Sequence, residues 1–237
     1  IIDYIESRRK SGEKGADILQ LILDTPYKDT GELMSDETVK VEILQLLVAG
    51  NETSTTAATW TLYQLARHPE HLEKIREEIE SVCGDKPIDY GVLHSLNYLI
   101  RVLNESMRTY PPFWMIDREA IHDDRFGDIN IPSGTTVIPY IYGAHHNEAY
   151  WPNPDEFNPD RFLDKHHPFS FIPFGGGPRV CIGQNMALMQ ILLVISTIVR
   201  DYDFELVDNK EVGIKSMMLL KPDGPMMMKV SKRVPRN

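Results

Sequence analysis

Apolar residues recur at helical spacing through the first part of the chain. Ala16 to Asp24 is a short helical stretch, and a turn region follows at Pro26–Gly31. Ser35 stands before an acidic pair, which is typical of a capped helix start because the helix dipole favours acidic side chains in the first turn. From there the pattern predicts a helix over residues 36–68, about 50 Å long at ~1.5 Å per residue.

Proline sets the boundaries of the next predicted helices. Pro69 suits the first position of a new helix, and apolar positions continue at helical spacing until Gly84. Another helix is predicted over 96–109, where Pro111 and Pro112 stop it because proline breaks a helix interior. The N-terminal part of the chain is therefore predicted to be helical.

The middle of the chain is rich in proline. Ten of the 16 prolines fall between residues 111 and 178, so this region is not mainly helical. Ile129–Ile131 and Thr135–Ile138 flank a Pro-Ser-Gly segment and predict a hairpin. Residues 151–171 contain four prolines and predict an irregular meander.

Regular structure is predicted again towards the C-terminus. An apolar helix is expected over 184–200, and short strands are expected near 204–207, 217–220 and 226–230. No repeat or linker-like composition divides the chain. We therefore predict one domain over residues 1–237, mainly α with small β elements.

Composition and charge narrow the class of protein. The 237 residues include 25 basic and 35 acidic side chains, and the net charge of −10 argues against a nucleic-acid partner. Hydrophobic residues make up 42% of the chain, which is ordinary for a soluble globular protein. The longest apolar run, residues 186–199, is interrupted by polar residues and is too short for a membrane span. Cys83 and Cys181 form neither a disulfide framework nor a CxxC metal pattern.

The strongest chemical signal is the segment 174–183, FGGGPRVCIG. Cys181 precedes an apolar helix, and the positive end of that helix dipole favours a thiolate. Glycines on both sides let backbone N–H groups approach the sulfur. Such a thiolate is a good iron ligand, and thiolate ligation promotes O–O cleavage at haem. An isolated cysteine in a glycine turn is more often a packed structural residue, so the surrounding pattern decides the interpretation.

That pattern resembles the FxxGxRxCxG signature of the cytochrome P450 family of haem-thiolate enzymes. Its five fixed positions are matched by Phe174, Gly177, Arg179, Cys181 and Gly183. The resemblance places these residues in a cofactor-binding loop, with Cys181 as the proximal metal ligand and Arg179 on a haem propionate. It implies heme b (iron protoporphyrin IX) as the cofactor. Members of the family are considerably longer, and the resemblance covers the C-terminal portion of their fold.

A second pattern is Glu105-x-x-Arg108, on the helix predicted over 96–109. A spacing of three places both side chains on one helix face, although an exposed pair of this kind contributes little. The segment 158–162, NPDRF, resembles the family's PxRF segment. By that resemblance Glu105, Arg108 and Arg161 form a buried structural network that braces the haem-binding core.

A third pattern interrupts the long helix. Gly50 and the Ser/Thr run that follows are poor helix formers, and glycine in a helix costs about 1 kcal/mol relative to alanine. A helix that accepts them needs a local opening or a close ligand. The simpler alternative is a threonine hydroxyl bonded to its own helix. Residues 49–53, AGNET, resemble the family's (A/G)Gx(D/E)T motif, which implies that Thr53 donates a hydrogen bond to dioxygen and that Glu52 relays protons.

Further positions take their interpretation from the same resemblance. Arg118 follows the Pro-Pro break as the family's propionate-binding arginine does, and His145 lies six residues before Trp151 in a pattern that we interpret as structural. Other histidines, including His68 and His71, are interpreted as surface residues rather than metal ligands. Apolar residues near the motifs are candidates for the substrate pocket, although such residues are more often core: Val48, Ala49, Phe113, Met115, Ile116 and Met217.

The resemblance implies a haem-thiolate monooxygenase. Such an enzyme inserts one oxygen atom from O2 into an apolar organic substrate, with electrons from a ferredoxin, flavodoxin or reductase. Two alternatives stay open. One is a haem-thiolate isomerase or dehydratase without external electrons, against which the intact Glu52-Thr53 pair argues. The other is a non-catalytic or incomplete haem-binding fragment.

Location and docking are less constrained. A cytoplasmic location is expected if no membrane anchor precedes Ile1. A basic patch of Lys74, Arg76, Lys165 and Arg200 is a candidate for receiving an acidic electron donor, although solvated charges are the simpler interpretation.

Overall fold

The structure is a computed structural model that describes residues 1–208 and 210–233. Helices predominate and the sheets are small, which confirms the predicted fold class. Contacts group the chain into two compact units, Ile1–Glu52 and Thr53–Asn237. Each unit has its own cluster of buried apolar side chains, and the single domain over residues 1–237 stays a prediction.

The first unit joins two short helices to the start of a long one. Its elements are α1 (Ile2–Ser11), α2 (Ile18–Asp24) and the first part of α3 (Asp36–Arg67). Asp17 caps α2 and pairs with Arg8 at 2.7 Å. The pattern did not predict α1, which buries one residue and so has no apolar stripe. The buried cluster comprises Ile5, Leu19, Leu23 and Val39.

α3 is continuous through its polar middle. The helix passes Gly50 without a break, so the local opening considered from the sequence does not occur. It ends at Arg67, one residue before the predicted end. His68 has non-helical backbone angles, φ −126° and ψ 70°, because the residue before a proline is pushed away from the helical region.

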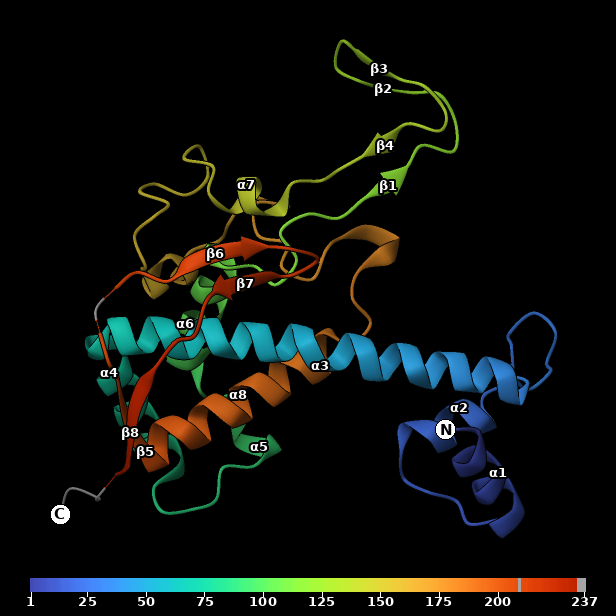
Figure 1. The fold of residues 1–237 in the computed structure, drawn as a ribbon, viewed down its shortest axis with the longest axis horizontal. Coiled ribbons are helices and arrows are strands. Elements are labelled where there is room, and N and C mark those ends of the chain that lie inside the picture. The colour runs from blue at the N-terminus through green and yellow to red at the C-terminus, as the bar shows by residue number, and fades with distance from the viewer. Residues whose placement is uncertain (209, 234–237) are drawn as a thin grey trace. The chain divides into compact units, whose positions relative to one another are not determined.

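The core of the second unit lies between helices. α4 (Pro69–Cys83), α5 (Tyr90–Leu93), α6 (Asn97–Thr109) and α8 (Gln184–Asp201) contribute to one buried cluster with Leu65 of α3. Figure 1 shows α4, α6 and α8 gathered along the C-terminal part of α3. These helices match the predicted segments to within one or two residues, and they support the cysteine loop.

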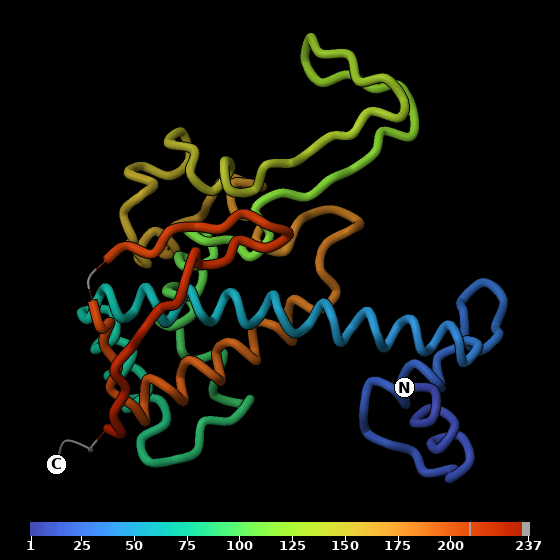
Figure 2. Tube along the Cα trace, in the orientation of Figure 1, coloured from blue at the N-terminus to red at the C-terminus, as the bar shows by residue number. Residues whose placement is uncertain are grey.

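The hairpin prediction was wrong in its pairing. β3 (Ile129–Ile131) pairs with β2 (Asp124–Phe126), whereas β4 (Thr136–Val137) pairs with β1 (Arg118–Glu119). The tight turn is the two-residue Gly127–Asp128, with Gly127 at φ +57°, and not the Pro-Ser-Gly segment. Glycine at the first central position of a two-residue turn matches the twist of antiparallel strands. Figure 2 traces these residues as one long extended arm.

Two further antiparallel pairs lie near the C-terminus. β5 (Tyr202–Leu206) pairs with β8 (Met228–Lys232), and β6 (Gly213–Ser216) pairs with β7 (Leu220–Asp223). The strand predicted near 217–220 is instead mostly the turn between β6 and β7, where a backbone bond joins Met217 and Leu219. The remaining short elements are α7 (Ile141–His145), η1 (Pro159–Leu163) and η2 (Gly177–Arg179). Among the described residues, no helix combines the length and hydropathy needed to cross a bilayer.

Candidate functional site

The loop that contains Cys181 is closed by its own backbone. The N–H of Cys181 donates to the Phe174 carbonyl at 3.0 Å, and Phe174 packs against the helical core. Gly175 and Gly177 adopt φ angles of +75° and +69°, which other residues rarely adopt. This turn places Cys181 in an exposed position three residues before α8 begins at Gln184.

The glycine that precedes α8 lies beside the sulfur. A Cβ at Gly183 would lie 3.9 Å from Cys181 Sγ. Gly183 precedes α8 without a side-chain cap, and the first N–H of the helix, that of Gln184, donates to the Cys181 carbonyl at 3.4 Å. Val180 and Ile182 are 47% and 95% exposed. The loop therefore presents a thiol among exposed apolar side chains, a surface suited to a flat apolar group.

Glu105 and Arg108 form a fully buried ion pair on α6. Two hydrogen bonds join them, Nε to Oε2 at 2.7 Å and Nη2 to Oε1 at 2.9 Å. Arg108 also donates to the carbonyls of His145 at 2.9 Å and Pro154 at 2.7 Å, and it lies 5.4 Å from the Trp151 ring. An unpaired charge in the interior costs several kcal/mol. The pair thus requires the meander carbonyls that surround it.

Arg161 reaches the same carboxylate from η1. Its Nε lies 3.4 Å from Glu105 Oε1, which also accepts the Asn158 N–H at 2.9 Å. Arg161 further donates to the carbonyls of Pro152 and Asn153. The structure therefore brings together the three residues predicted to form one network, and it ties α6 to the meander.

His145 connects this network to the cysteine loop. Its carbonyl accepts from Arg108, and its Nε2 accepts the Ile172 N–H at 2.9 Å. Burial lowers the pKa of His145 to about 3, so the ring stays neutral and keeps the lone pair that this bond needs. Ile172 lies two residues before Phe174, where the loop begins. The side chain of His145 thus has the structural role expected for it.

The segment after the Pro-Pro break meets the C-terminal strands. The Leu220 N–H donates to the Pro112 carbonyl at 2.9 Å, and Trp114 Nε1 donates to the Met217 carbonyl at 2.7 Å. Met217 keeps 58% of its surface exposed in the turn between β6 and β7. Met217 and the residues around Trp114, all candidates for the pocket, therefore lie close together.

The other pocket candidates fall into two groups. Residues 113–116 belong to the second unit, and Ile116 Cδ1 lies 4.0 Å from where a Cβ at Gly175 would be. This places the segment against the cysteine loop. Val48 and Ala49 are exposed and belong to the first unit, so their part in a pocket stays a prediction.

Two exposed arginines stand without a carboxylate. Arg118 lies on β1 and donates to the Asp117 carbonyl at 2.6 Å, and Arg179 lies at the end of η2. Within residues 1–208 and 210–233, neither guanidinium forms an ion pair with an acidic side chain. Both arginines have open hydrogen-bonding capacity for an added carboxylate.

The polar motif of α3 spans the boundary between the two units. Glu52 is exposed and ends the first unit, while Thr53 is half-buried and begins the second. Ser54 Oγ, next to Thr53, is buried and has no hydrogen-bond partner in the described part of the chain. A buried hydroxyl without a partner is costly. The Ser54 hydroxyl is therefore a polar group that the described part of the chain leaves unsatisfied in the middle of α3.

One arginine of the predicted basic patch is not available at the surface. Arg76 is almost fully buried, with bonds of 2.6 Å to Glu73 and to Asp203. Arg200 pairs with its neighbour Asp201 at 2.8 Å but stays partly exposed, and Lys74 and Lys165 are exposed. A docking role for these three residues stays a prediction.

Comparison with known proteins decides what this arrangement is. The family model for cytochrome P450 matches residues 1–230. The chain belongs to the cytochrome P450 family. It is 34% identical to Cytochrome P450 4c3 of Drosophila melanogaster over 91% of this chain and 41% of that protein. It is also 34% identical to Cytochrome P450 3A41 of Mus musculus, over 98% of this chain and 48% of that protein.

A solved structure supports the same conclusion. The crystal structure of the cytochrome P450DA heme domain superimposes with a TM-score of 0.93 at 31% identity, over 99% of this chain and 53% of that chain. The chain spans about half the length of the curated relatives and of the solved P450 that it matches. Its fold is therefore the corresponding portion of the P450 fold.

Membership of the P450 family implies a haem cofactor, and the residues present fit one. Cys181 offers an exposed thiol as a sulfur ligand, and Arg118 and Arg179, which form no ion pair within the described part of the chain, offer two cations. A cleft of about 380 Å³ lies between α6, residues 171–175 and α8. Its lining includes Phe174 and Gly175, so it adjoins the start of the cysteine loop.

Sequence reasoning missed how the loop is held. The bond from Ile172 N–H to His145 Nε2 and the orphaned Ser54 hydroxyl have no local signal. The pattern identified His145 only by its distance from Trp151. Its partner 27 residues later is set by the tertiary fold.

Proposed function

We propose that this chain carries out haem-thiolate monooxygenase chemistry, in which one oxygen atom of O2 is inserted into an apolar organic substrate. The observation that carries the proposal is the exposed Cys181 at the end of its glycine loop, in a chain of the P450 family. Heme b supplies the activation of dioxygen when bound. The protein supplies the thiolate, the pocket and the path for protons.

Each candidate residue has a distinct part in this proposal. Cys181 would ligate the iron, and Arg118 and Arg179 would neutralise the propionates. Residues 113–116 with Met217 form an apolar wall for substrate, since they lie together beside the loop and part of their surface stays exposed. Apolar walls exclude water and keep the oxidising chemistry on the substrate.

Thr53 and Glu52 are assigned to proton delivery. The hydroxyl of Thr53 would donate a hydrogen bond to dioxygen, and the exposed carboxylate of Glu52 would relay protons to it. Electrons come from a ferredoxin, flavodoxin or reductase. The presence of both residues favours oxygen chemistry over an isomerase or dehydratase, which needs no proton delivery to dioxygen.

The test uses the two cysteines of the chain. Haem-loaded protein is reduced and exposed to carbon monoxide, and the absorption spectrum is recorded for the wild type, Cys181→Ser and Cys83→Ala. Cys83 is buried among core residues of α4 and serves as the matched control. We expect the strongly red-shifted band in the wild type and in Cys83→Ala but not in Cys181→Ser, because only a thiolate ligand produces it.

A second measurement separates catalysis from haem binding. The haem-loaded protein is supplied with a surrogate reductase and a panel of fatty acids and terpenoids. Oxygenated product supports the monooxygenase. The red-shifted band without any product would instead identify a haem-binding chain that does not turn over. A band that persists in Cys181→Ser would contradict the assignment of the ligand.

A further inference from the structure

Three metal-ligating side chains meet where α3 ends and α4 begins. His68 occupies the break between the helices, and Glu70 and His71 lie in the first turn of α4. Glu70 Oε1 lies 3.5 Å from His68 Nδ1 and 3.9 Å from His71 Nε2. The three ligand atoms all lie within 4.8 Å of one another. This cluster belongs to the second unit and is separate from the cysteine loop.

The spacing suits a metal ion better than direct hydrogen bonds. Charge-assisted hydrogen bonds between such groups are about 2.7–2.9 Å long. Ligands held tetrahedrally at about 2.0–2.1 Å from zinc are roughly 3.4 Å apart. The observed distances of 3.5 and 3.9 Å are close to the second value. The two distances from Glu70 are thus close to those between ligands of one metal ion, and all three ligand atoms lie within 4.8 Å of one another.

The two imidazoles are held by a surrounding shell. His71 Nδ1 lies 2.6 Å from the Tyr98 hydroxyl on α6, which leaves Nε2 facing Glu70. The Phe157 ring stacks on His68 at 5.1 Å and meets His71 edge-on at 5.5 Å. Metal-binding histidines typically use the second ring nitrogen in this way, and such partners fix the ring orientation.

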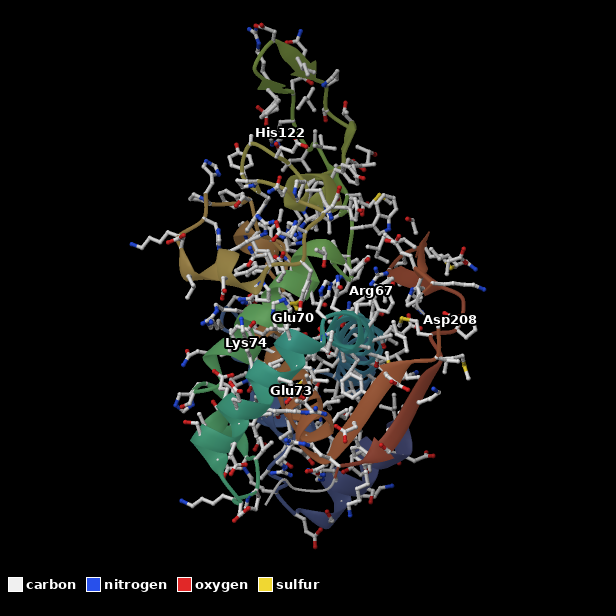
Figure 3. The ribbon with its side chains drawn as sticks, turned by 90° about the vertical axis from the view of Figure 1, so that its left-hand side faces the viewer. Arg67, Glu70, Glu73, Lys74, His122 and Asp208 are labelled. Atoms are coloured by element: carbon white, nitrogen blue, oxygen red, sulfur yellow. The ribbon has the colours of Figure 1, made fainter. Side chains whose placement is uncertain are left out.

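The charge around the cluster is mixed. Glu70 is 60% exposed, which opens the cluster to ions from solvent. Lys74 lies one turn further along α4, with its ammonium group 5.4 Å from the centre of the Tyr98 ring (Figure 3). That positive charge opposes a cation and limits its affinity.

We propose that His68, Glu70 and His71 form a binding site for a divalent first-row transition metal, with zinc as the best match and water in the fourth position. Two nitrogen ligands and one carboxylate are a common donor set for zinc. A bound ion would join the His68 break to α4 and so stabilise the junction between the helices. This site is independent of the haem chemistry proposed above.

The test is a titration of the haem-loaded protein with zinc chloride, followed by calorimetry and by competition with a chromophoric chelator. We expect one zinc ion per chain at this site and an affinity weakened about tenfold or more in Glu70→Gln and in His71→Gln. Glu70 is exposed, so its variant keeps the fold even if His71→Gln does not. The matched controls are His122→Gln and Glu77→Gln, which change exposed residues outside the cluster.

A second measurement tests the Tyr98 hydroxyl that contacts His71. Tyr98→Phe removes the hydroxyl that contacts His71 Nδ1, and we expect it to weaken zinc binding while Glu77→Gln does not. Cys181 is unchanged in every protein, so zinc on that thiol would contribute equally to all titrations. Zinc affinity that is absent from the wild type, or equal in the wild type and Glu70→Gln, would overturn the proposal.

Discussion

Removal of the buried guanidinium of Arg108 is the most severe single change that the structure identifies. In Arg108→Ala, Glu105 loses bonds of 2.7 and 2.9 Å, and the carbonyls of His145 and Pro154 lose their bonds at 2.9 and 2.7 Å. The carboxylate stays buried with 0% exposure. Its remaining partners are the Asn158 N–H and the Arg161 guanidinium.

The expected loss in the free energy of unfolding follows from the bonds that Glu105 loses and keeps. Removing one partner of a buried ion pair costs about 3–5 kcal/mol. Because Asn158 and Arg161 still compensate part of the Glu105 charge, we expect the lower end, about 3 kcal/mol of the free energy of unfolding. Typical domains have only about 5–15 kcal/mol in total. The variant should therefore lose a large share of its stability and release haem more readily.

The assay is urea denaturation of the haem-loaded protein, followed by circular dichroism and haem absorbance. Arg125→Ala is the matched control, because Arg125 pairs with Asp128 at the same i,i+3 spacing but in an exposed position. We expect no measurable change for this control, since exposed ion pairs contribute little. A loss below about 1 kcal/mol in Arg108→Ala would refute the reasoning that burial makes this pair indispensable.

Three further predictions concern single residues. Thr53→Ala should consume reductant while it yields more peroxide and less oxygenated product, and an unchanged ratio of product to reductant would remove Thr53 from proton delivery. Gly175→Ala should lower the free energy of unfolding by about 1–2 kcal/mol, because a φ of +75° is strained for an L residue with a side chain. Thermal denaturation measures this loss, and an unchanged midpoint would contradict the prediction. His145 has its pKa lowered to about 3 by burial, so the unfolded chain binds the proton more readily and stability falls as the pH drops below the ordinary value of 6.5. In His145→Gln, the free energy of unfolding should change less with pH between about pH 7 and 4, by up to ~1.4 kcal/mol per pH unit. The same slope in the variant and the wild type would show that the His145 ring does not cause the pH dependence.

Local sequence determined the helices that frame the site. The predicted segments 96–109 and 184–200 correspond to α6 and α8, which run over 97–109 and 184–201. Their limits depend on prolines and on glycines next to apolar stripes, and these signals act within one or two turns. The cysteine loop was also local, since all five positions of its signature fall within ten residues.

The pairing of short strands was harder to predict, because one strand can pair with the segment before it or with the segment after it. Ile129–Ile131 has suitable turn residues on both sides, Gly127 before it and Gly134 after it. The structure uses the Gly127 turn for the tight hairpin and leaves the later turn to the wider β1–β4 pair. Pairing across the Gly127 turn and pairing across the Gly134 turn both fit the strand propensity of Ile129–Ile131. Only the register of the whole arm, residues 118–137, distinguishes the two pairings.

The tertiary structure alone decided which polar groups meet. Arg108 finds the His145 carbonyl 37 residues away, and Arg76 finds Asp203 127 residues away. Burial of apolar faces brings these segments together, and each buried polar atom must then bond to the nearest available partner. For the same reason His71 meets Tyr98 rather than bulk solvent. Sequence alone therefore determined the main helices and predicted the thiol as the ligand, whereas long-range packing determined the network that holds the loop and the histidine cluster at the start of α4.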